Sequence, residues 1–367
     1  MLRRIVYLCF GMVLMACAQT VPTLQETYQI LEKSEMMYTI DMLDSTYEAP
    51  LYEEVVSHGI YLAIDSSKDE IYIEHYGNDF EGKPDLQEVF RQAEQAFQTG
   101  NLDSAQARYL RLHDSFPENS QISTYIAQTY GIQGEFDLAR TWYTKALQSN
   151  PRDYLAHWLL ADIFQAQKEI DTAVYHITMA KILNRNNPRL MPLFEKIYAQ
   201  AGMSYSDWSF TPRIQLQQTD DRNFRIATDA DQIAWLGYAL CKALWAFEPG
   251  YRDSMITEAE TFPELYQERI CMLQLLNLYE KSKKDTGLLL PSVELALEAA
   301  EKGFFDEFII YEILLKQKPI LAMVLTLDIC KNIIRYVRAM HTIPSLEPAP
   351  SDSTQSKPDS QYQSRRG

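Results

Sequence analysis

The chain has 367 residues, of which 46% are hydrophobic and 23% charged, enough to build cores for about two or three domains. Its formal net charge of −16 argues against nucleic-acid binding, because phosphate contacts require clustered lysine and arginine. The sequence contains no H-E-x-x-H metal motif, glycine-rich phosphate loop or G-x-S-x-G nucleophile motif. We therefore expect no enzyme activity, no cofactor and no metal site.

Residues 1–18 have the features of an export signal. Arg3 and Arg4 precede an apolar run of 12 residues, too short for the roughly 30 Å hydrocarbon core of a bilayer. The sequence L-M-A-C at 14–17 resembles the lipobox of exported bacterial lipoproteins, which implies lipidation of Cys17 and membrane anchoring in the periplasm or outer membrane. The alternative is cleavage after Ala18, which would release a soluble secreted chain.

Residues 19–84 are expected to form a helix followed by a β-hairpin. Apolar residues at helical spacing predict a helix from Thr23 to Leu43. Strand-forming residues at 60–64 and 71–73 flank a polar turn at 66–69, which predicts the hairpin. The alternative is a helix continuing from Tyr52. His58 and His75 lack the spacing of metal ligands, so we expect structural or solvated histidines there.

The next stretch repeats itself with a period of 34 residues. Pro117 and Pro151 lie 34 residues apart at the ends of two units. Glycine occupies the expected turn between two helices in the first two units, and lysine occupies it in the third. Small residues recur where helices must approach closely. The recurring turn and small residues are Gly100, Gly134 and Lys168, then Ala93, Ala127 and Ala161, then Ala105, Ala139 and Ala173.

This spacing resembles the tetratricopeptide repeat family, with units at 86–119, 120–153 and 154–187 in a region 85–202. The resemblance implies paired helices stacked into a curved α-solenoid. The first helix of each unit would line a concave groove that binds a protein or peptide. The predicted groove residues are Gln87, Phe90, Glu94, Phe97, Gln121, Thr124, Gln128, Leu155, Trp158, Asp162 and Gln165.

The predicted groove differs from one known use of such repeats. Tetratricopeptide domains that clamp a C-terminal carboxylate resemble each other in carrying Lys and Asn in the groove, and these positions hold neither. The alternative role for Phe90, Phe97 and Trp158 is packing between units. A groove filled by the protein's own chain would remove the binding interpretation.

Residues 203–342 are expected to form a helical C-terminal domain with a second hairpin at 213–226. A helix capped by Asp229 or Asp231 and ending at about Phe247 is apolar on nearly every face and should be central. Its Lys242 could line a pocket or extend past aromatic rings to Glu248 or water. Further helices are predicted at 263–281, 291–302, 304–316 and 319–341. They could form a bundle or continue the solenoid.

Residues 343–367 are rich in Pro, Ser, Gln and Asp, which predicts a disordered tail. Cys241, Cys271 and Cys330 lie in apolar runs and are expected to be buried free thiols. Short Asp-Ser/Thr motifs, as at 103–105, resemble the O-glycosylation sites of exported Bacteroidetes proteins.

The predicted fold class is mainly α, a tetratricopeptide α-solenoid followed by a helical C-terminal domain, with two short β-hairpins. The predicted function is an exported scaffold or adaptor that binds a protein or peptide in the bacterial cell envelope, without nucleic acid. The alternative is a glycan- or small-molecule-binding lipoprotein using Trp142, Trp158 and Trp208.

Overall fold

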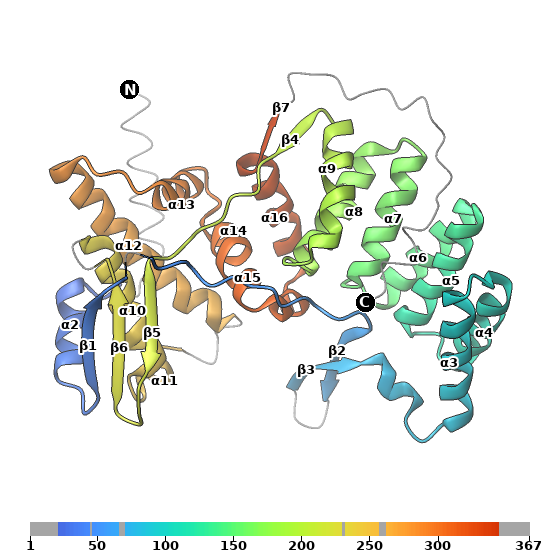
Figure 1. Ribbon diagram of the computed structural model, residues 1–367, viewed down its shortest axis with the longest axis horizontal. Helices are drawn as coiled ribbons and strands as arrows, with labels where there is room; N and C mark the ends of the chain where they lie inside the picture. The colour runs from blue at the N-terminus through green and yellow to red at the C-terminus, as the bar shows by residue number, and fades with distance from the viewer. Residues whose placement is uncertain (1–20, 45, 66–69, 230–231, 257–261, 345–367) are drawn as a thin grey trace. The chain divides into compact units, whose positions relative to one another are not determined.

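The computed structural model describes residues 21–44, 46–65, 70–229, 232–256 and 262–344. The leader with Cys17 and almost all of the tail lie outside these residues. The chain is mainly α-helical and forms two compact units (Figure 1). Unit 1 comprises residues 1–51 and 208–314, and unit 2 comprises residues 52–207 and 315–367. Each unit thus combines distant parts of the sequence, whereas we expected contiguous segments.

Unit 2 contains the predicted α-solenoid. Successive helices stack as antiparallel pairs, as Figure 1 shows. The pairs are α3 (Pro84–Gln98) with α4 (Leu102–Ser115), α5 (Ser120–Gln133) with α6 (Phe136–Ser149), and α7 (Tyr154–Ala166) with α8 (Ile170–Leu183). This arrangement confirms the predicted helix pairs.

The turns within the pairs have the backbone conformation that the sequence predicted. Gly100 has φ 78° and Gly134 has φ 84°, a region that L side chains rarely adopt. Lys168 has φ 63° at the corresponding turn and is the only positive-φ residue other than glycine among the described residues. The recurring alanines are fully buried, so the helices approach closely at Ala93, Ala105, Ala127, Ala139, Ala161 and Ala173.

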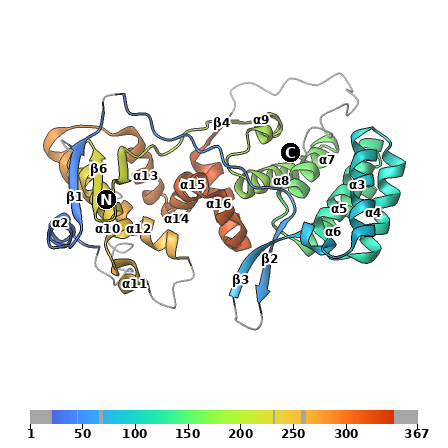
Figure 2. The same ribbon diagram turned by 60° about the horizontal axis from the view of Figure 1, so that its bottom comes forward.

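The N-terminal part of unit 2 confirms the first predicted hairpin. Strand β2 (Ile60–Asp65) pairs antiparallel with β3 (Glu70–His75), with Leu62 opposite Ile73. The hairpin stands apart from the helix pairs in Figure 2. The 3₁₀-helix η1 (Tyr76–Phe80) follows and leads to α3.

The C-terminal part of unit 2 returns to the repeats. After η2 (Pro188–Leu190) and α9 (Met191–Gln200), strand β4 (Met203–Tyr205) pairs antiparallel with β7 (Thr342–Pro344). Residues 343 and 344 are therefore in a strand, not in a disordered tail. Next to β7 in sequence, α16 (Leu327–Met340) packs on α8.

The helix predicted at 319–341 is in fact two elements. The 3₁₀-helix η4 (Pro319–Val324) follows the short α15 (Leu315–Gln317), and the chain is extended at Leu325. The Thr326 side chain then accepts a hydrogen bond from the Ile329 N–H and caps α16. The sequence interpretation missed this cap.

Unit 1 is built on a three-stranded sheet in the order β1–β6–β5. Strand β1 (Met37–Met42) runs parallel to β6 (Asn223–Thr228), and β5 (Ile214–Gln218) is antiparallel to β6. The second predicted hairpin is confirmed and gains a third strand. The helix predicted at Thr23–Leu43 is wrong beyond α2 (Leu24–Glu32), because β1 pairs with a strand far along the sequence.

Helices cover this sheet and form most of the core of unit 1. The buried helix α10 (Ile233–Phe247) places Leu240 and Leu244 against Ile226 of β6. It packs on α12 (Pro263–Thr286). The remaining helices are α11 (Tyr251–Met255), α13 (Pro291–Glu301), α14 (Phe305–Phe308) and the π-helix η3 (Ile309–Leu314).

Lys242 of α10 has a structural partner within unit 1. Its Nζ donates a hydrogen bond to Glu268 Oε2 of α12 at 2.5 Å, and the Tyr238 hydroxyl donates to Glu268 Oε1 at 2.5 Å. The partner is thus Glu268 rather than the expected Glu248, which accepts a hydrogen bond from Tyr38. The predicted buried free thiols are confirmed at Cys241, Cys271 and Cys330. No helix in the described part of the chain is both long and apolar enough to span a membrane.

Candidate functional site

A segment that belongs to no helix or strand up to residue 57 and turns at residues 58–59 lies across the repeats, and we call its residues 52–60 the strap. Asn184 binds the strap through the main chain: its Oδ1 accepts from the Val56 N–H at 2.9 Å, and its Nδ2 donates to the Val56 carbonyl at 3.0 Å. Asn150 Nδ2 donates to the Ile60 carbonyl at 3.1 Å. The two asparagines follow α6 and α8 directly and lie one repeat apart, so successive repeats each donate a side-chain amide hydrogen bond to a strap carbonyl.

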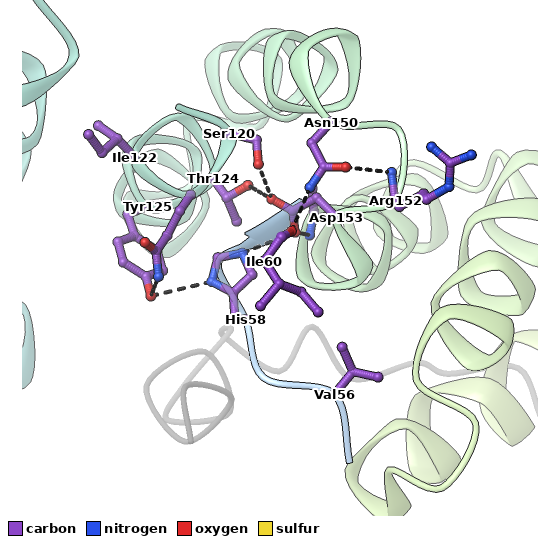
Figure 3. Close-up of polar contacts among 12 residues, drawn as sticks. Val56, His58, Ile60, Ser120, Ile122, Thr124, Tyr125, Asn150, Arg152 and Asp153 are labelled. Atoms are coloured by element: carbon purple, nitrogen blue, oxygen red, sulfur yellow. Dashed lines mark hydrogen bonds and ion pairs between the residues drawn. The ribbon is translucent and has the colours of Figure 1, made fainter. Parts of the chain in front are cut away.

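His58 fastens the middle of the strap to the junction between α5 and α7 (Figure 3). Its Nε2 lies 3.0 Å from Asp153 Oδ1, and Ser120 and Thr124 donate hydroxyl hydrogen bonds to Asp153 Oδ2 at 3.1 and 2.9 Å. Burial alone would raise the Asp153 pKa, but the charge of His58 and hydrogen bonds from His58, Ala156 and Thr124 outweigh it and lower the pKa. This network stabilises a buried carboxylate.

The strap needs glycine where it passes α5. Gly59 has φ +92°, and a Cβ there would lie 2.6 Å from Gln121 Nε2. Gln121 Nε2 also donates to the Tyr125 hydroxyl at 3.1 Å, and that hydroxyl lies 3.3 Å from His58 Nδ1. The Gln121 amide is therefore positioned by the strap and by Tyr125 together.

A pocket of about 320 Å³ opens beside the end of the strap. Two aromatic rings, Phe80 and Phe90, form part of its wall, with centroids 5.1 Å apart. Nothing lies within 4 Å of the position of a Cβ on Gly77, so this wall is open. The lining contains no Asp, Glu, Lys or Arg and consists of His58, Gly59, His75, Gly77, Phe80, Gln87, Phe90 and Gln121.

The structure brings only part of the predicted groove to this pocket. Gln87, Phe90 and Gln121 line it. Five other predicted groove residues are buried in the repeats, which corrects our expectation of a continuous open surface; they are Phe97, Thr124, Gln128, Leu155 and Trp158. Part of the predicted groove is also filled by the protein's own chain, since His58 of the strap contacts Asp153, to which Thr124 donates. The expectation of a free groove therefore does not hold there, and the pocket is the part that is open.

The last three predicted groove residues lie elsewhere. Glu94 accepts a hydrogen bond from the Tyr109 hydroxyl within the first unit. Gln165 Nε2 donates to Gln200 Oε1 of α9 at 3.1 Å, and Asp162 is partly exposed on α7. None of the three lines the pocket.

Sequence reasoning missed the strap and the residues that hold it. The signal was present in part, because Asn150 and Asn184 occupy equivalent positions of successive repeats. A polar residue repeated at a helix end, however, suggests a helix cap. Asn119 does cap α5 through its side chain, whereas the Asn150 and Asn184 side chains donate to strap carbonyls. Within the described residues, no group of three or more His, Cys, Asp or Glu side chains is placed to hold a metal ion.

Comparison with known proteins supports the class of this region. A family model described as tetratricopeptide repeat matches residues 90–152 and again 126–188. One similar solved structure is the first tetratricopeptide domain of Spaghetti (RPAP3) bound to the HSP90 peptide SRMEEVD. It is 20% identical, with a TM-score of 0.29, and the match covers 30% of this chain and 89% of that one. Comparison with curated proteins found no match. The protein thus contains tetratricopeptide repeats at residues 90–188.

Proposed function

We propose that the protein is a non-enzymatic scaffold or adaptor that binds a protein or peptide partner at the pocket beside the strap. The observation that carries this proposal is that Gln87, Phe90 and Gln121, three predicted groove residues, line one open pocket. Its volume of about 320 Å³ suits a single large side chain or a short turn of a partner. Tetratricopeptide repeats, which form extended binding surfaces, are consistent with this role.

The chemistry of the lining indicates what the pocket would accept. Phe80 and Phe90 offer apolar surface, and the Gln87 and Gln121 amides can donate and accept hydrogen bonds. Because the lining lacks lysine and arginine, it offers no fixed positive charge to a terminal carboxylate. We therefore propose a neutral apolar or aromatic side chain as the ligand group.

The proposed location is the bacterial cell envelope, with a lipid anchor at Cys17. This part of the proposal rests on the export features of residues 1–18. The alternative function, glycan or small-molecule binding, has less support. The Trp158 ring is only 2% exposed, and Trp142 packs edge-on against His113 with Lys145 over its ring.

Filling the pocket tests the proposed function. A displayed library of random heptapeptides would be selected on the wild-type protein, and the enriched peptides titrated against Gly77→Trp and Gly77→Ala. The tryptophan should fill the pocket, while alanine adds one methyl group in open space. We expect enriched peptides to lose at least about tenfold in affinity for Gly77→Trp and to keep it for Gly77→Ala. Failure of any peptide to enrich, or equal binding to both variants, would contradict the proposal.

A further inference from the structure

We propose that the strap occupies a second peptide-binding site of the repeats, and that a partner's segment with the pattern aliphatic–x–His–Gly–aliphatic exchanges with it. This rests on the proposed function in one respect, that the protein has a peptide partner. It goes further by naming an adjoining site, whose strap residues His58 and Gly59 also line the pocket, and the chemistry that this site recognises. The argument starts from how the strap is held.

The first observation is that the repeats recognise the strap through its main chain. Asn184 satisfies both the N–H and the carbonyl of Val56, and Asn150 and Asn186 donate to the carbonyls of Ile60 and Glu54 at 3.1 Å each. Every peptide except one with proline at the Val56 position offers the same groups. Recognition of this kind is independent of which chain supplies the segment.

The second observation is that alternate strap side chains face the repeats. Val56 is 4% exposed and Ile60 6% exposed, while His58 between them pairs with Asp153. Val55 is 44% exposed, and Ser57 is also exposed. Over residues 55–58 this alternation is that of an extended strand bound on one face, and the chain then turns at Gly59, which has φ +92°, before it reaches Ile60. It defines three subsites, aliphatic at the first and third positions and an imidazole opposite a buried carboxylate at the second.

The third observation is that the binding groups belong to the repeats and not to the strap. Asn150 and Asn184 occupy one position in successive units, and Asp153 is the side-chain cap of α7. Strap residues 52–57 belong to no helix or strand. A partner's segment would therefore meet the same binding groups once the strap has left, and Tyr52 and Val55 of the strap are 36% and 44% exposed.

The test uses a synthetic capped peptide with the sequence of residues 52–62, YEEVVSHGIYL, and a control peptide with proline in place of Val56. Binding is measured to the full-length protein and to its Val56→Pro variant. That variant removes the Val56 N–H, whose hydrogen bond Asn184 Oδ1 accepts, and changes none of the repeat residues that bind the strap. We expect the peptide to bind Val56→Pro at least about tenfold more tightly than it binds the wild type, and the proline peptide to bind neither.

Two further measurements keep the proposal testable. Asn184→Ala added to Val56→Pro should weaken peptide binding at least about tenfold, since it removes both main-chain hydrogen bonds. Should Val56→Pro fail to fold, hydrogen exchange of the Val56 amide in the wild type tests the proposal instead. Excess peptide should speed this exchange because it displaces the strap from Asn184, whereas the proline peptide should not. Unchanged exchange, or equal peptide affinity for a folded Val56→Pro and the wild type, would overturn the proposal.

The pocket variant separates this proposal from the proposed function. Gly77→Trp is designed to fill the pocket, whose lining includes His58 and Gly59 of the strap but not Asn150, Asp153 or Asn184. The strap peptide should therefore bind a Val56→Pro/Gly77→Trp double variant as it binds Val56→Pro. Loss of strap-peptide binding on filling the pocket would show that there is one site and not two, and would overturn the second site.

Discussion

Asn184 and Val56 exchange two hydrogen bonds across 128 residues of sequence. One joins the Val56 N–H to Asn184 Oδ1 at 2.9 Å, and the other joins Asn184 Nδ2 to the Val56 carbonyl at 3.0 Å. Both partners are buried, so these bonds are shielded from competing water. They fix the strap to the end of the third repeat, and Asn150 fixes it to the end of the second.

Asn184→Ala is expected to lower the free energy of unfolding by about 2–4 kcal/mol. The change leaves the buried Val56 N–H and carbonyl without their side-chain partner, and an unsatisfied buried group costs about 1–3 kcal/mol. Urea unfolding followed by far-ultraviolet circular dichroism measures the difference. Gln148→Ala, on an exposed face of α6, is the control and should change stability by less than about 0.5 kcal/mol. An equal effect of the two changes would contradict this role of Asn184.

His58→Ala is expected to destabilise the protein by about 3 kcal/mol at pH 7. It leaves the buried Asp153 carboxylate without the imidazole that lies 3.0 Å from it, and removing one partner of a buried pair typically costs about 3–5 kcal/mol. A double-mutant cycle with Asp153→Asn isolates the pair, and we expect the combined loss to be smaller than the sum of the single losses. Strict additivity would mean that the two side chains are not coupled.

The same carboxylate should contribute to acid unfolding. The Asp153 pKa is lowered in the folded state from its ordinary value of 3.8. The folded state therefore favours the ionised form, so its contribution is complete above pH 3.8 and is lost as pH falls through the folded pKa. The stability lost by Asp153→Asn should accordingly shrink as the pH is lowered below 4, as measured by urea unfolding at a series of pH values.

A buried histidine pair should make stability depend on pH between 6.5 and 4. His157 Nε2 lies 3.2 Å from the Pro151 carbonyl and so donates to it, which leaves its Nδ1 to accept from His176 Nδ1 at 2.8 Å. Burial lowers the pKa of His157 to about 4 and that of His176 to about 3. Below pH 6.5 these two histidines bind protons in the unfolded chain but not in the folded protein. The free energy of unfolding therefore decreases as the pH is lowered, by about 1.4 kcal/mol per pH unit for each histidine.

His176→Phe should reduce this slope to about half, because one of the two histidines no longer takes up a proton on unfolding. The phenyl ring can keep the stacking of His176 on Phe164, whose ring centroid lies 5.3 Å away. The measurement is the urea midpoint at pH 7, 6 and 5, with His75→Gln, which replaces an exposed histidine, as the control. An unchanged slope in His176→Phe would contradict the assignment.

Lys242→Met is expected to cost unit 1 about 3–5 kcal/mol. Two side chains, Lys242 and Tyr238, donate hydrogen bonds to the buried Glu268 carboxylate, and the change removes the charged one. The second change Glu268→Gln should restore part of the loss, since a neutral amide can still accept from Tyr238. Lys302→Met, at an exposed i,i+4 pair, is the control and should cost less than about 1 kcal/mol in thermal unfolding. If the double variant were less stable than Lys242→Met, this explanation would be wrong.

The sequence predicted the repeats well because their determinants are local. Small residues at Ala105 and Ala139 and turn residues at Gly134 and Lys168 act within one or two helices, so spacing alone reveals them. It failed where a helical pattern was extended too far. Tyr38 continues the spacing of Leu24, Tyr28 and Leu31, but residues 37–42 lie as β1 beside β6, with Thr39 opposite Arg225. Nothing near residue 39 in the sequence indicates this partner.

The candidate site was predictable only in part for the same reason. Helical spacing placed Gln87, Phe90 and Gln121 on one surface, and the pocket uses all three. It could not show that Thr124 donates to Asp153, or that His58 reaches that carboxylate across 95 residues. Burial of Trp158 likewise depends on how neighbouring units pack, which a periodic pattern does not specify.

The position of the strap in the chain sets an order of events during synthesis. Residues 52–60 leave the ribosome before any of the three helix pairs, yet their last anchors, Asn184 and Asn186, come directly after the third pair. Nascent domains generally fold as they emerge, N-terminal part first. Here the strap, the earliest segment of unit 2, can bind fully only after the third repeat has been made. A nascent chain on a ribosome stalled before residue 184 would therefore have paired helices but a strap without its Asn184 hydrogen bonds.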